Sequence, residues 1–250
     1  MFSRLVPDFR AMIAVVAETG STNADLLAAL AKGERPAEGD WLVTDRQSAG
    51  RGRQGRAWFD GAGNFMGSTV VYAGASDPPL HTVALIAGLA LHTVIAGLLD
   101  GAGDPRLKWP NDLMIGRAKL AGILLERAAD AVVVGIGVNI ACAPQIAGRE
   151  TAALVSFGPI VYRDVFAGQL AAAFAGELDR WRREGLAPTI AQWCAAAHPP
   201  GTPLLVGEPG EAPLKGEFYG LGPDGALIIT LLGGTRQTIH AGEVRLGPQT

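Results

Sequence analysis

The stretch GRGRQGRAW, residues 50–58, alternates glycine with arginine and ends on a tryptophan; we call it the Gly/Arg loop. Its glycines let the backbone approach a ligand and offer bare N–H groups to it. Its arginines carry planar guanidinium groups that pair with carboxylate or phosphate oxygens, and they repel one another within so short a loop. We therefore expect an anion here, with Trp58 stacked on a heteroaromatic ring. A solvated surface turn and a contact for single-stranded nucleic acid are the alternatives.

A second motif, KWPNDL at residues 108–113, puts a cation, an amide and a carboxylate on a turn stiffened by Pro110. A nucleic-acid site rarely holds a fixed carboxylate toward phosphate. An enzyme that uses ATP can do so, because Asp112 would hold Mg²⁺ or orient an incoming amine. On its own the motif is equally explained as a structural turn, but beside the Gly/Arg loop it favours an enzyme.

Two further segments carry single polar residues on apolar strands. In KLAGILLE (119–126), Lys119 opens a strand that reads as buried on both faces, where a lysine is costly unless it meets an anion. The alternative is a lysine whose ammonium group reaches solvent. In GIGVN (135–139), two glycines permit close approach of a ligand and Asn139 offers a polar tip, although a strand bulge explains the glycines equally well.

Alternating and helical apolar spacing predict the order of elements. A helix is expected from an N-cap at Thr22, with Asp25 three residues on, to a stop at Gly33. Its apolar stripe is Leu26, Leu27 and Leu30. Strands are predicted at 11–17, 41–45, 65–72 and 132–140, with a hairpin at 106–126 that turns at residues 115–117. Two more helices are predicted at 163–185 and 188–196, the first with the stripe Val165, Phe166, Leu170, Phe174, Leu178 and Trp181.

Composition narrows the class of protein. The 250 residues are 48% hydrophobic and 18% charged, so a sizeable core is expected, and the net charge of -3 argues against an overall electrostatic grip on nucleic acid or an anionic membrane. The uncharged run at 81–99 is long enough to span a bilayer, but its two histidines and two threonines favour a helix buried against a sheet.

The two cysteines and the first residues of the sequence give information on the cellular compartment. Cys142 and Cys194 lie in no zinc pattern, and two isolated thiols suggest a reducing compartment. The start MFSRLVPDFR has no apolar region of a signal peptide, and the first 20 residues are too few for a helix-turn-helix domain. A cytoplasmic location is therefore expected.

Beyond HPPG (198–201) the chain changes character to short strands with turn signals about every ten residues, which is typical of a small β-barrel. We place a domain boundary there, with one domain at 1–198 and a second at 199–250.

These segments, taken in order, resemble the biotin protein ligases, that is, the biotin–[acetyl-CoA-carboxylase] ligases. The matching stretches are STN (21–23), Gln47 with the Gly/Arg loop, KWPNDL, KLAGILLE and GIGVN, with a weaker likeness over 184–193 and the tail. The resemblance implies an α+β fold: a mixed sheet flanked by helices that binds biotin and ATP, followed by a small SH3-like C-terminal domain. It implies the monofunctional form, without the DNA-binding domain of some members.

The resemblance also implies the reaction. ATP, with Mg²⁺, would activate biotin as biotinyl-5′-AMP, and the biotinyl group would pass to a lysine of the biotin carboxyl carrier protein of acetyl-CoA carboxylase or a similar carboxylase. No DNA or membrane partner is expected. A homodimer is possible, with strand 132–140 pairing between two copies.

Site residues carried over by the resemblance fall into three groups. The catalytic residues would be Lys119, Arg51 and Asp112, and Asp112 would bind Mg²⁺ or accept a proton from the attacking amine. The biotin-binding residues would be Ser21, Thr22, Asn23, Gln47, Gly50, Arg51, Gly52, Arg53, Lys119 and Gly122. The ATP-binding residues would be Arg53, Arg56, Trp58, Lys108, Asn111 and Asn139, with Trp58 on the adenine. The rivals are a lipoate ligase of the same fold, a non-catalytic nucleic-acid binder and a scaffold.

Overall fold

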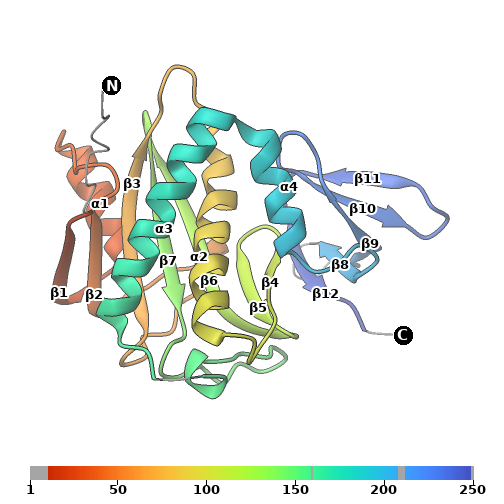
Figure 1. Cartoon of the computed structure of the whole chain (residues 1–250), viewed down its shortest axis with the longest axis horizontal. Helices are drawn as coiled ribbons and strands as arrows, with labels where there is room; N and C mark the ends of the chain where they lie inside the picture. Colours follow the sequence, from red (N-terminus) through yellow and green to blue (C-terminus); the bar gives the residue numbers. More distant parts are fainter. Residues whose placement is uncertain (1–10, 159, 208–211, 249–250) are drawn as a thin grey trace, which may run out of the picture.

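The computed structural model describes residues 11–158, 160–207 and 212–248, so the expectation about the first ten residues lies outside the described part. A seven-stranded mixed sheet forms the larger part, in the order β1-β2-β3-β7-β6-β5-β4 (Figure 1). Only the first pair, β1 with β2, is parallel. The strands are β1 (Ile13–Thr19), β2 (Trp41–Gln47), β3 (Phe65–Tyr72), β4 (Pro105–Lys108), β5 (Asp112–Ile115), β6 (Ala118–Ala128) and β7 (Ala131–Val138).

Helices cover both faces of this sheet. Because side chains alternate along a strand, Val70 and Val133 face α1 (Thr22–Ala31), whereas Val71 and Val134 face the main core with the other helices. Those helices are α2 (Val83–Leu99), α3 (Arg163–Glu184) and α4 (Leu186–Ala196), and α2 and α3 cross in front of the sheet in Figure 1. The predicted stripe of α1 packs on Val70 and Val133, so that prediction is confirmed.

The long apolar run is the core helix α2. Residues Leu80–Leu99 are long and apolar enough to cross a membrane by length and composition alone, with a mean hydropathy of 2.1, yet 61% of the most apolar stretch is buried inside the protein. It packs between the sheet and the helices α3 and α4. The prediction of a buried helix is therefore confirmed.

Three local predictions were wrong. Ser21, not Thr22, is the N-cap of α1, and Asp25 accepts a hydrogen bond from the Thr19 hydroxyl instead of closing a capping box. Val165 is 56% exposed, because it lies about 100° around the helix from Phe166, the first buried residue of the stripe. The strand predicted at 132–140 cannot pair with a second copy, because β7 is already paired with β3 on one side and β6 on the other.

The predicted hairpin is a three-stranded antiparallel meander of β4, β5 and β6. Its second turn joins Ile115 to Ala118 through Gly116, whose φ of 57° suits glycine. This meander brings KWPNDL and the start of KLAGILLE side by side, since Asp112 and Gly122 are partners across β5 and β6.

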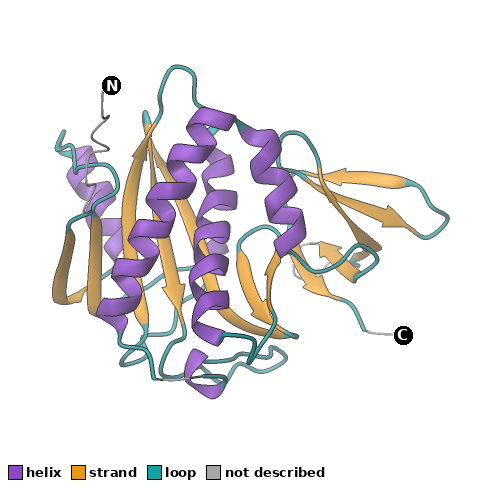
Figure 2. Ribbon diagram, in the orientation of Figure 1, coloured by secondary structure: helices purple, strands orange, loops and turns teal. Residues whose placement is uncertain are grey.

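After α4, the elements in the described part of the chain are strands (Figure 2). They form an antiparallel sheet in the order β11-β10-β9-β8-β12. The strands are β8 (Pro203–Gly207), β9 (Leu214–Leu221), β10 (Leu227–Leu231), β11 (Arg236–Ile239) and β12 (Glu243–Leu246). The change from helices to strands falls between α4 and β8. The two parts share one apolar core, which Trp193 and Phe218 join with ring centroids 6.4 Å apart.

Candidate active site

A cavity of about 320 Å³ opens where α1 begins, β2 ends and the Gly/Arg loop passes over β6 and β7. It brings together most of the residues predicted to bind biotin. Those lining it are Ser21, Thr22, Asn23, Gln47, Arg51, Gly52, Arg53, Lys119 and Gly122. Gly50 packs against Gln47, which lines the cavity. A Cβ on Gly50 would lie 2.9 Å from the Gln47 amide nitrogen.

One end of the cavity is a chain of buried polar side chains. Gln47 Oε1 accepts a hydrogen bond from the Thr22 backbone N–H at 2.9 Å. Because that N–H can only donate, the amide oxygen of Gln47 faces Thr22 and its NH₂ group faces the other way. The Thr22 hydroxyl lies 2.6 Å from Ser68 Oγ, and Ser68 donates to Asn23 Oδ1 at 2.6 Å. This connectivity fixes the orientation of the polar groups around the cavity.

The polar chain continues to the Gly/Arg loop. Asn23 Nδ2 donates to Glu126 Oε2 at 2.8 Å, and Arg51 lies 3.9 Å from the other oxygen of Glu126. Ser68 and Glu126 were not among the predicted site residues. Both occupy positions inside strands; Ser68 lines the cavity, whereas Glu126 contacts two lining residues, Asn23 and Arg51. Glu126 was within reach of the sequence argument, since it ends the KLAGILLE motif.

The Gly/Arg loop is a tight turn closed by its own backbone. Trp58 N donates to Gly50 O at 2.9 Å and Gly52 N donates to Arg56 O at 2.7 Å. At its tip Gln54 and Gly55 both have positive φ, 57° and 70°, as in the central pair of a type I′ turn. Positive φ is uncommon for a residue such as glutamine, and the loop holds it next to the cavity.

Trp58 lies inside the cavity, against the sheet. A Cβ at Gly137 would lie 2.2 Å from Trp58 Cε2, and one at Gly122 would lie 3.1 Å from its Cζ3. The sequence argument assigned this ring to the adenine, but it shares the cavity with the residues predicted for biotin. Lys119 Nζ lies 5.6 Å from the centre of the ring, within the range of a cation–π interaction.

Lys119 also faces a wider groove between the sheet and β12, and so belongs to both spaces. Among the residues that the structure describes, seven basic side chains line the groove, against the three acidic side chains of Asp112, Glu150 and Glu243. The basic residues are Arg53, Arg56, Lys108, Arg117, Lys119, Arg149 and Arg245. A surplus of positive charge in a concave site favours a polyanionic ligand.

Asp112 joins the two lysines of the predicted site. Its Oδ1 lies 2.5 Å from Lys119 Nζ and its Oδ2 lies 2.8 Å from Lys108 Nζ. Burial alone would raise the pKa of Asp112, but the charges and hydrogen bonds of Lys108 and Lys119 outweigh it and hold the pKa well below its usual range. A carboxylate with so low a pKa is a poor proton acceptor. It is placed instead to fix the position of the Lys119 ammonium group.

The same pairing does not fit a magnesium ligand. Both oxygens of Asp112 already face ammonium groups, which a divalent cation would have to displace. Across residues 11–158, 160–207 and 212–248, no three His, Cys, Asp or Glu side chains gather in a group that could hold a metal ion. The structure therefore gives no support to the predicted metal role of Asp112.

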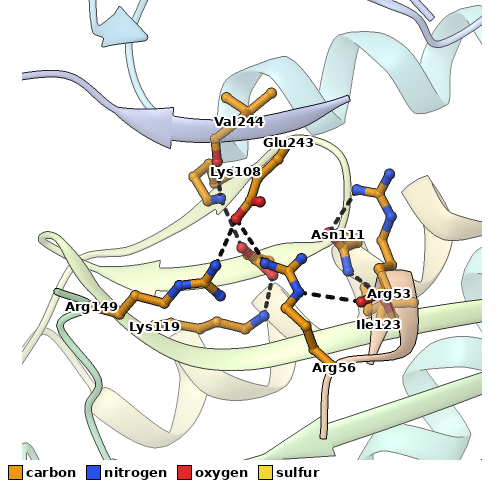
Figure 3. Close-up of polar contacts among 10 residues, drawn as sticks. Arg53, Arg56, Lys108, Asn111, Lys119, Ile123, Arg149, Glu243 and Val244 are labelled. Carbon is orange, nitrogen blue, oxygen red and sulfur yellow. Dashed lines mark hydrogen bonds and ion pairs between the residues drawn. The ribbon is translucent and has the colours of Figure 1, made fainter. Parts of the chain in front are cut away.

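Four residues predicted to bind ATP lie around the groove, namely Arg53, Arg56, Lys108 and Asn111 (Figure 3). Asn111 donates to Ile123 O at 2.7 Å, and its Oδ1 lies 3.5 Å from an Arg53 guanidinium nitrogen. Lys108 is 12% exposed, and its ammonium group meets both Asp112 and the carbonyl of Val244. Arg56 pairs with Glu243 at 2.7 Å, and Arg149 pairs with the same oxygen at 2.8 Å. Arg149 and Glu243 were not among the predicted site residues.

Asn139, the remaining residue predicted for ATP, is buried at one side of the cavity. Its Nδ2 donates to Ala152 O at 3.1 Å, while its Oδ1 has no hydrogen-bond partner within the described part of the chain. A buried amide oxygen without a partner is costly, so a donor on a ligand would stabilise it.

Comparison with known proteins assigns these features to a family. Residues 17–140 match the biotin/lipoate A/B protein ligase family, and residues 206–247 match the biotin protein ligase C-terminal domain. The chain is 38% identical to a biotin–[acetyl-CoA-carboxylase] ligase of Paracoccus denitrificans, over 93% of this chain and 100% of that one. It is 34% identical to the protein of the same name from Mycobacterium tuberculosis, over 92% of this chain and 87% of that one.

Solved structures share the fold. A biotin protein ligase of Aquifex aeolicus in complex with biotin and ATP superposes with a TM-score of 0.81 at 23% identity, covering 94% of this chain and 99% of that one. A biotin protein ligase of Leishmania major in complex with biotinyl-5-AMP gives a TM-score of 0.64 at 24% identity, covering 92% and 99%.

Proposed function

The chain belongs to the biotin protein ligases, and from this we propose that it joins biotin to protein in two steps driven by ATP. In the first step a carboxylate oxygen of biotin attacks the α-phosphorus of ATP, which forms biotinyl-5′-AMP and releases pyrophosphate. In the second step the ε-amine of a lysine on a biotin carboxyl carrier protein attacks the acyl carbon, an amide bond forms and AMP leaves. The names of the Paracoccus and Mycobacterium relatives support acetyl-CoA carboxylase as the source of the acceptor.

The observation that carries the proposal is the junction of the cavity and the cationic groove at Lys119. Biotin and ATP are both anionic where they react, so the first step brings two repelling groups together. A fixed ammonium group at that junction offsets the repulsion and stabilises the charge that grows in the transition state. Asp112 keeps this ammonium group in position, and Arg51 and Arg53 add positive charge from the Gly/Arg loop.

The cavity supports biotin as the activated acid. The ureido ring needs both donors and acceptors, and Ser21, Thr22 and the NH₂ group of Gln47 supply them at the buried end. The Trp58 ring offers an apolar wall to the aliphatic chain of biotin. The Gly/Arg loop above it excludes water from the reactive mixed anhydride.

The groove and Asn139 support ATP as the co-substrate. The basic groups beyond Lys119 suit the phosphates, and Mg²⁺ would arrive with them as part of the substrate. The unpartnered Oδ1 of Asn139 suits the exocyclic amine of adenine. Structures of the same fold from Aquifex and Leishmania hold biotin with ATP and biotinyl-5-AMP. We also propose a cytoplasmic location, which the two free thiols, Cys142 and Cys194, support.

The test is the mass of a purified carrier domain after incubation with the protein, ATP, Mg²⁺ and either biotin or lipoate. We expect one added biotinyl group and none from lipoate, because a site that hydrogen-bonds a ureido group rejects an acid lacking it. Lipoylation without biotinylation would assign the chain to the lipoate branch, and an unchanged carrier would overturn the proposal.

The role of Lys119 has its own test. Lys119→Ala should lower biotin-dependent exchange of pyrophosphate into ATP by on the order of 10²–10³, because the charge at the reacting centre is lost. Asp112 keeps Lys108 as a partner in this variant, so the fold should survive, and thermal unfolding checks that it does. Full exchange activity would remove Lys119 from the mechanism.

A further inference from the structure

The first observation is that basic groups of the larger domain hold the strand β12. Among the described residues, β12 is the last strand of the C-terminal sheet and pairs with β8, so its other edge leaves backbone carbonyls available. Lys108 Nζ donates to Val244 O at 2.7 Å. Arg117 donates to Leu246 O at 2.9 Å and to Gly247 O at 2.8 Å. These bonds fix β12 at the rim of the groove.

Glu243, the first residue of β12, then reaches into the groove (Figure 3). Its Oε1 accepts from Arg56 at 2.7 Å and from Arg149 at 2.8 Å, and its side chain is only 14% exposed. Burial alone would raise the pKa of Glu243, but the hydrogen bond and charge of Arg56, with the charges of Arg149 and Arg245, outweigh burial and hold the pKa below its ordinary value. The carboxylate is therefore ionised at neutral pH, and its Oε1 is shared by the two arginines.

The two arginines lie on separate segments of the chain. Arg56 belongs to the Gly/Arg loop, and Arg149 to the segment 141–152 that runs past Asn139 and the start of β6. Without a shared carboxylate two guanidinium groups this close would repel each other. Glu243 thus joins the two segments to each other and to the C-terminal domain at one oxygen atom.

This contact is compatible with a bound polyphosphate. An arginine carries five N–H donors, and Glu243 engages one nitrogen of each guanidinium group. Arg56 and Arg149 are 39% and 46% exposed, so their remaining donors can reach a phosphate while the pairing persists.

Building on the proposed function, we propose that Glu243 is a positioning residue that latches the Gly/Arg loop and the segment 141–152 to the C-terminal domain, so that Arg56 and Arg149 meet the phosphates of ATP together. The alternative is that Glu243 only occupies the arginines until phosphate displaces it. The two ideas predict opposite effects of removing its charge, since a latch assists ATP binding and a competitor opposes it.

The deciding variant is Glu243→Gln, which keeps the size of the side chain. Pyrophosphate exchange is measured while ATP and biotin are varied in turn. The latch predicts a KM for ATP raised about tenfold, which corresponds to the loss of one charged hydrogen-bonded contact. It predicts a much smaller change in kcat and in the KM for biotin. A KM for ATP that is unchanged or lower would overturn the proposal.

Glu150→Gln is the matched control. It removes the same charge from the same groove, where the Glu150 carboxylate pairs with Arg117 at 3.5 Å. Glu150 follows Arg149 directly in the chain, but among the described residues no ion pair joins its carboxylate to Arg56 or Arg149. The latch predicts opposite shifts in the KM for ATP, upward for Glu243→Gln and slightly downward for Glu150→Gln. Equal shifts in both variants would show a charge effect without a latch.

A measurement that needs no catalysis separates this inference from the proposed function. Trypsin cuts after Arg51, Arg53 or Arg56 when the Gly/Arg loop opens. Glu243→Gln should speed cleavage within residues 50–58 several-fold over the wild type and Glu150→Gln, at unchanged thermal stability. Equal cleavage rates would overturn the latch even if the wild type biotinylates its carrier. Absence of exchange in the wild type would instead count against the proposed function.

Discussion

Two glycines that face each other across β6 and β7 leave the space that Trp58 fills. Gly122 pairs with Gly137, and a Cβ on Gly137 would lie 2.2 Å from the Trp58 ring. Non-bonded carbon atoms pack at about 3.5–4.0 Å, so any side chain at this position would compete with the ring. Neither glycine has a positive φ, and packing rather than backbone conformation requires them here.

Gly137→Ala should therefore push Trp58 away from the sheet and deform the wall of the cavity. We expect the KM for biotin in pyrophosphate exchange to rise about tenfold or more, within the usual cost of one added methyl group in a packed site. Gly20→Ala is the control, because a Cβ at Gly20 has nothing within 4 Å although it precedes Ser21. A KM for biotin that stays within twofold of the wild type in Gly137→Ala would show that Trp58 does not shape the biotin site.

Sequence motifs pointed to residues that line the candidate site, but not to the residues that those side chains contact. Short motifs supplied Thr22, Gln47 and Lys119 because their residue types and spacing already suit anionic and polar ligands, and the cavity brings them together. Ser68 and Glu243 could not be found this way. Ser68 faces the cavity only because β3 packs under α1, and Glu243 reaches the groove only because two domains meet. Such partners depend on tertiary pairing, which local sequence does not encode.

At the scale of elements, burial of most of its surface explains why α2 looks like a membrane segment. Most of its side chains face the sheet, α3 or α4, so little polar surface is needed. Its two glycines occupy different environments. A Cβ on Gly88 would lie 3.3 Å from a Leu107 methyl group and 3.4 Å from Trp193 Nε1, whereas a Cβ on Gly97 would have nothing within 4 Å.

The same substitution at these two glycines should have opposite effects on stability. Gly88→Leu should lower the free energy of unfolding by about 1–3 kcal/mol, because it overpacks the contact between α2 and Trp193. Gly97→Leu should raise it by about 0.5–1 kcal/mol, because leucine favours a helix more than glycine does and the site is exposed. Urea unfolding of both variants measures the difference. Similar stabilities would mean that α2 is not packed as described.

Helices and strands with a strong apolar periodicity were predicted correctly from the sequence. The errors arose where one sequence pattern is compatible with two different structures. The strands, the core helix and the stripe from Phe166 to Trp181 are present as predicted. Val165 was misassigned because an apolar residue beside a stripe has the same local pattern whether it is covered or not. The continuous apolar run of β7 indicated a buried strand. Whether that strand lies at the edge or in the centre of the sheet depends on which strands pair with it, and the run itself does not show this.

At the scale of the whole molecule, a histidine lies beside the apolar part of the junction between the two domains. His198 follows α4 and lies in a small gap lined by Leu107, Trp193 and Phe218. Its Nε2 is buried with no hydrogen-bond partner among the described residues. Burial, followed by the charges of Lys108 and Arg106, lowers the pKa of His198 to about 4.

This shift makes the docked arrangement sensitive to acid. An unfolded histidine has a pKa of about 6.5, so between roughly pH 6.5 and 4 the unfolded chain binds a proton that the folded chain does not. Stability due to this group is therefore fully present above that window and falls as the pH falls through it. His198→Leu removes the titrating ring from an apolar site. The free energy of unfolding of this variant should therefore decline less steeply between pH 6.5 and 4.5 than that of the wild type. The difference in slope should correspond to the uptake of at most one proton on unfolding. Urea unfolding of both proteins across this range gives the two slopes, and parallel slopes would mean that acid reaches His198 equally well in the folded and unfolded chains.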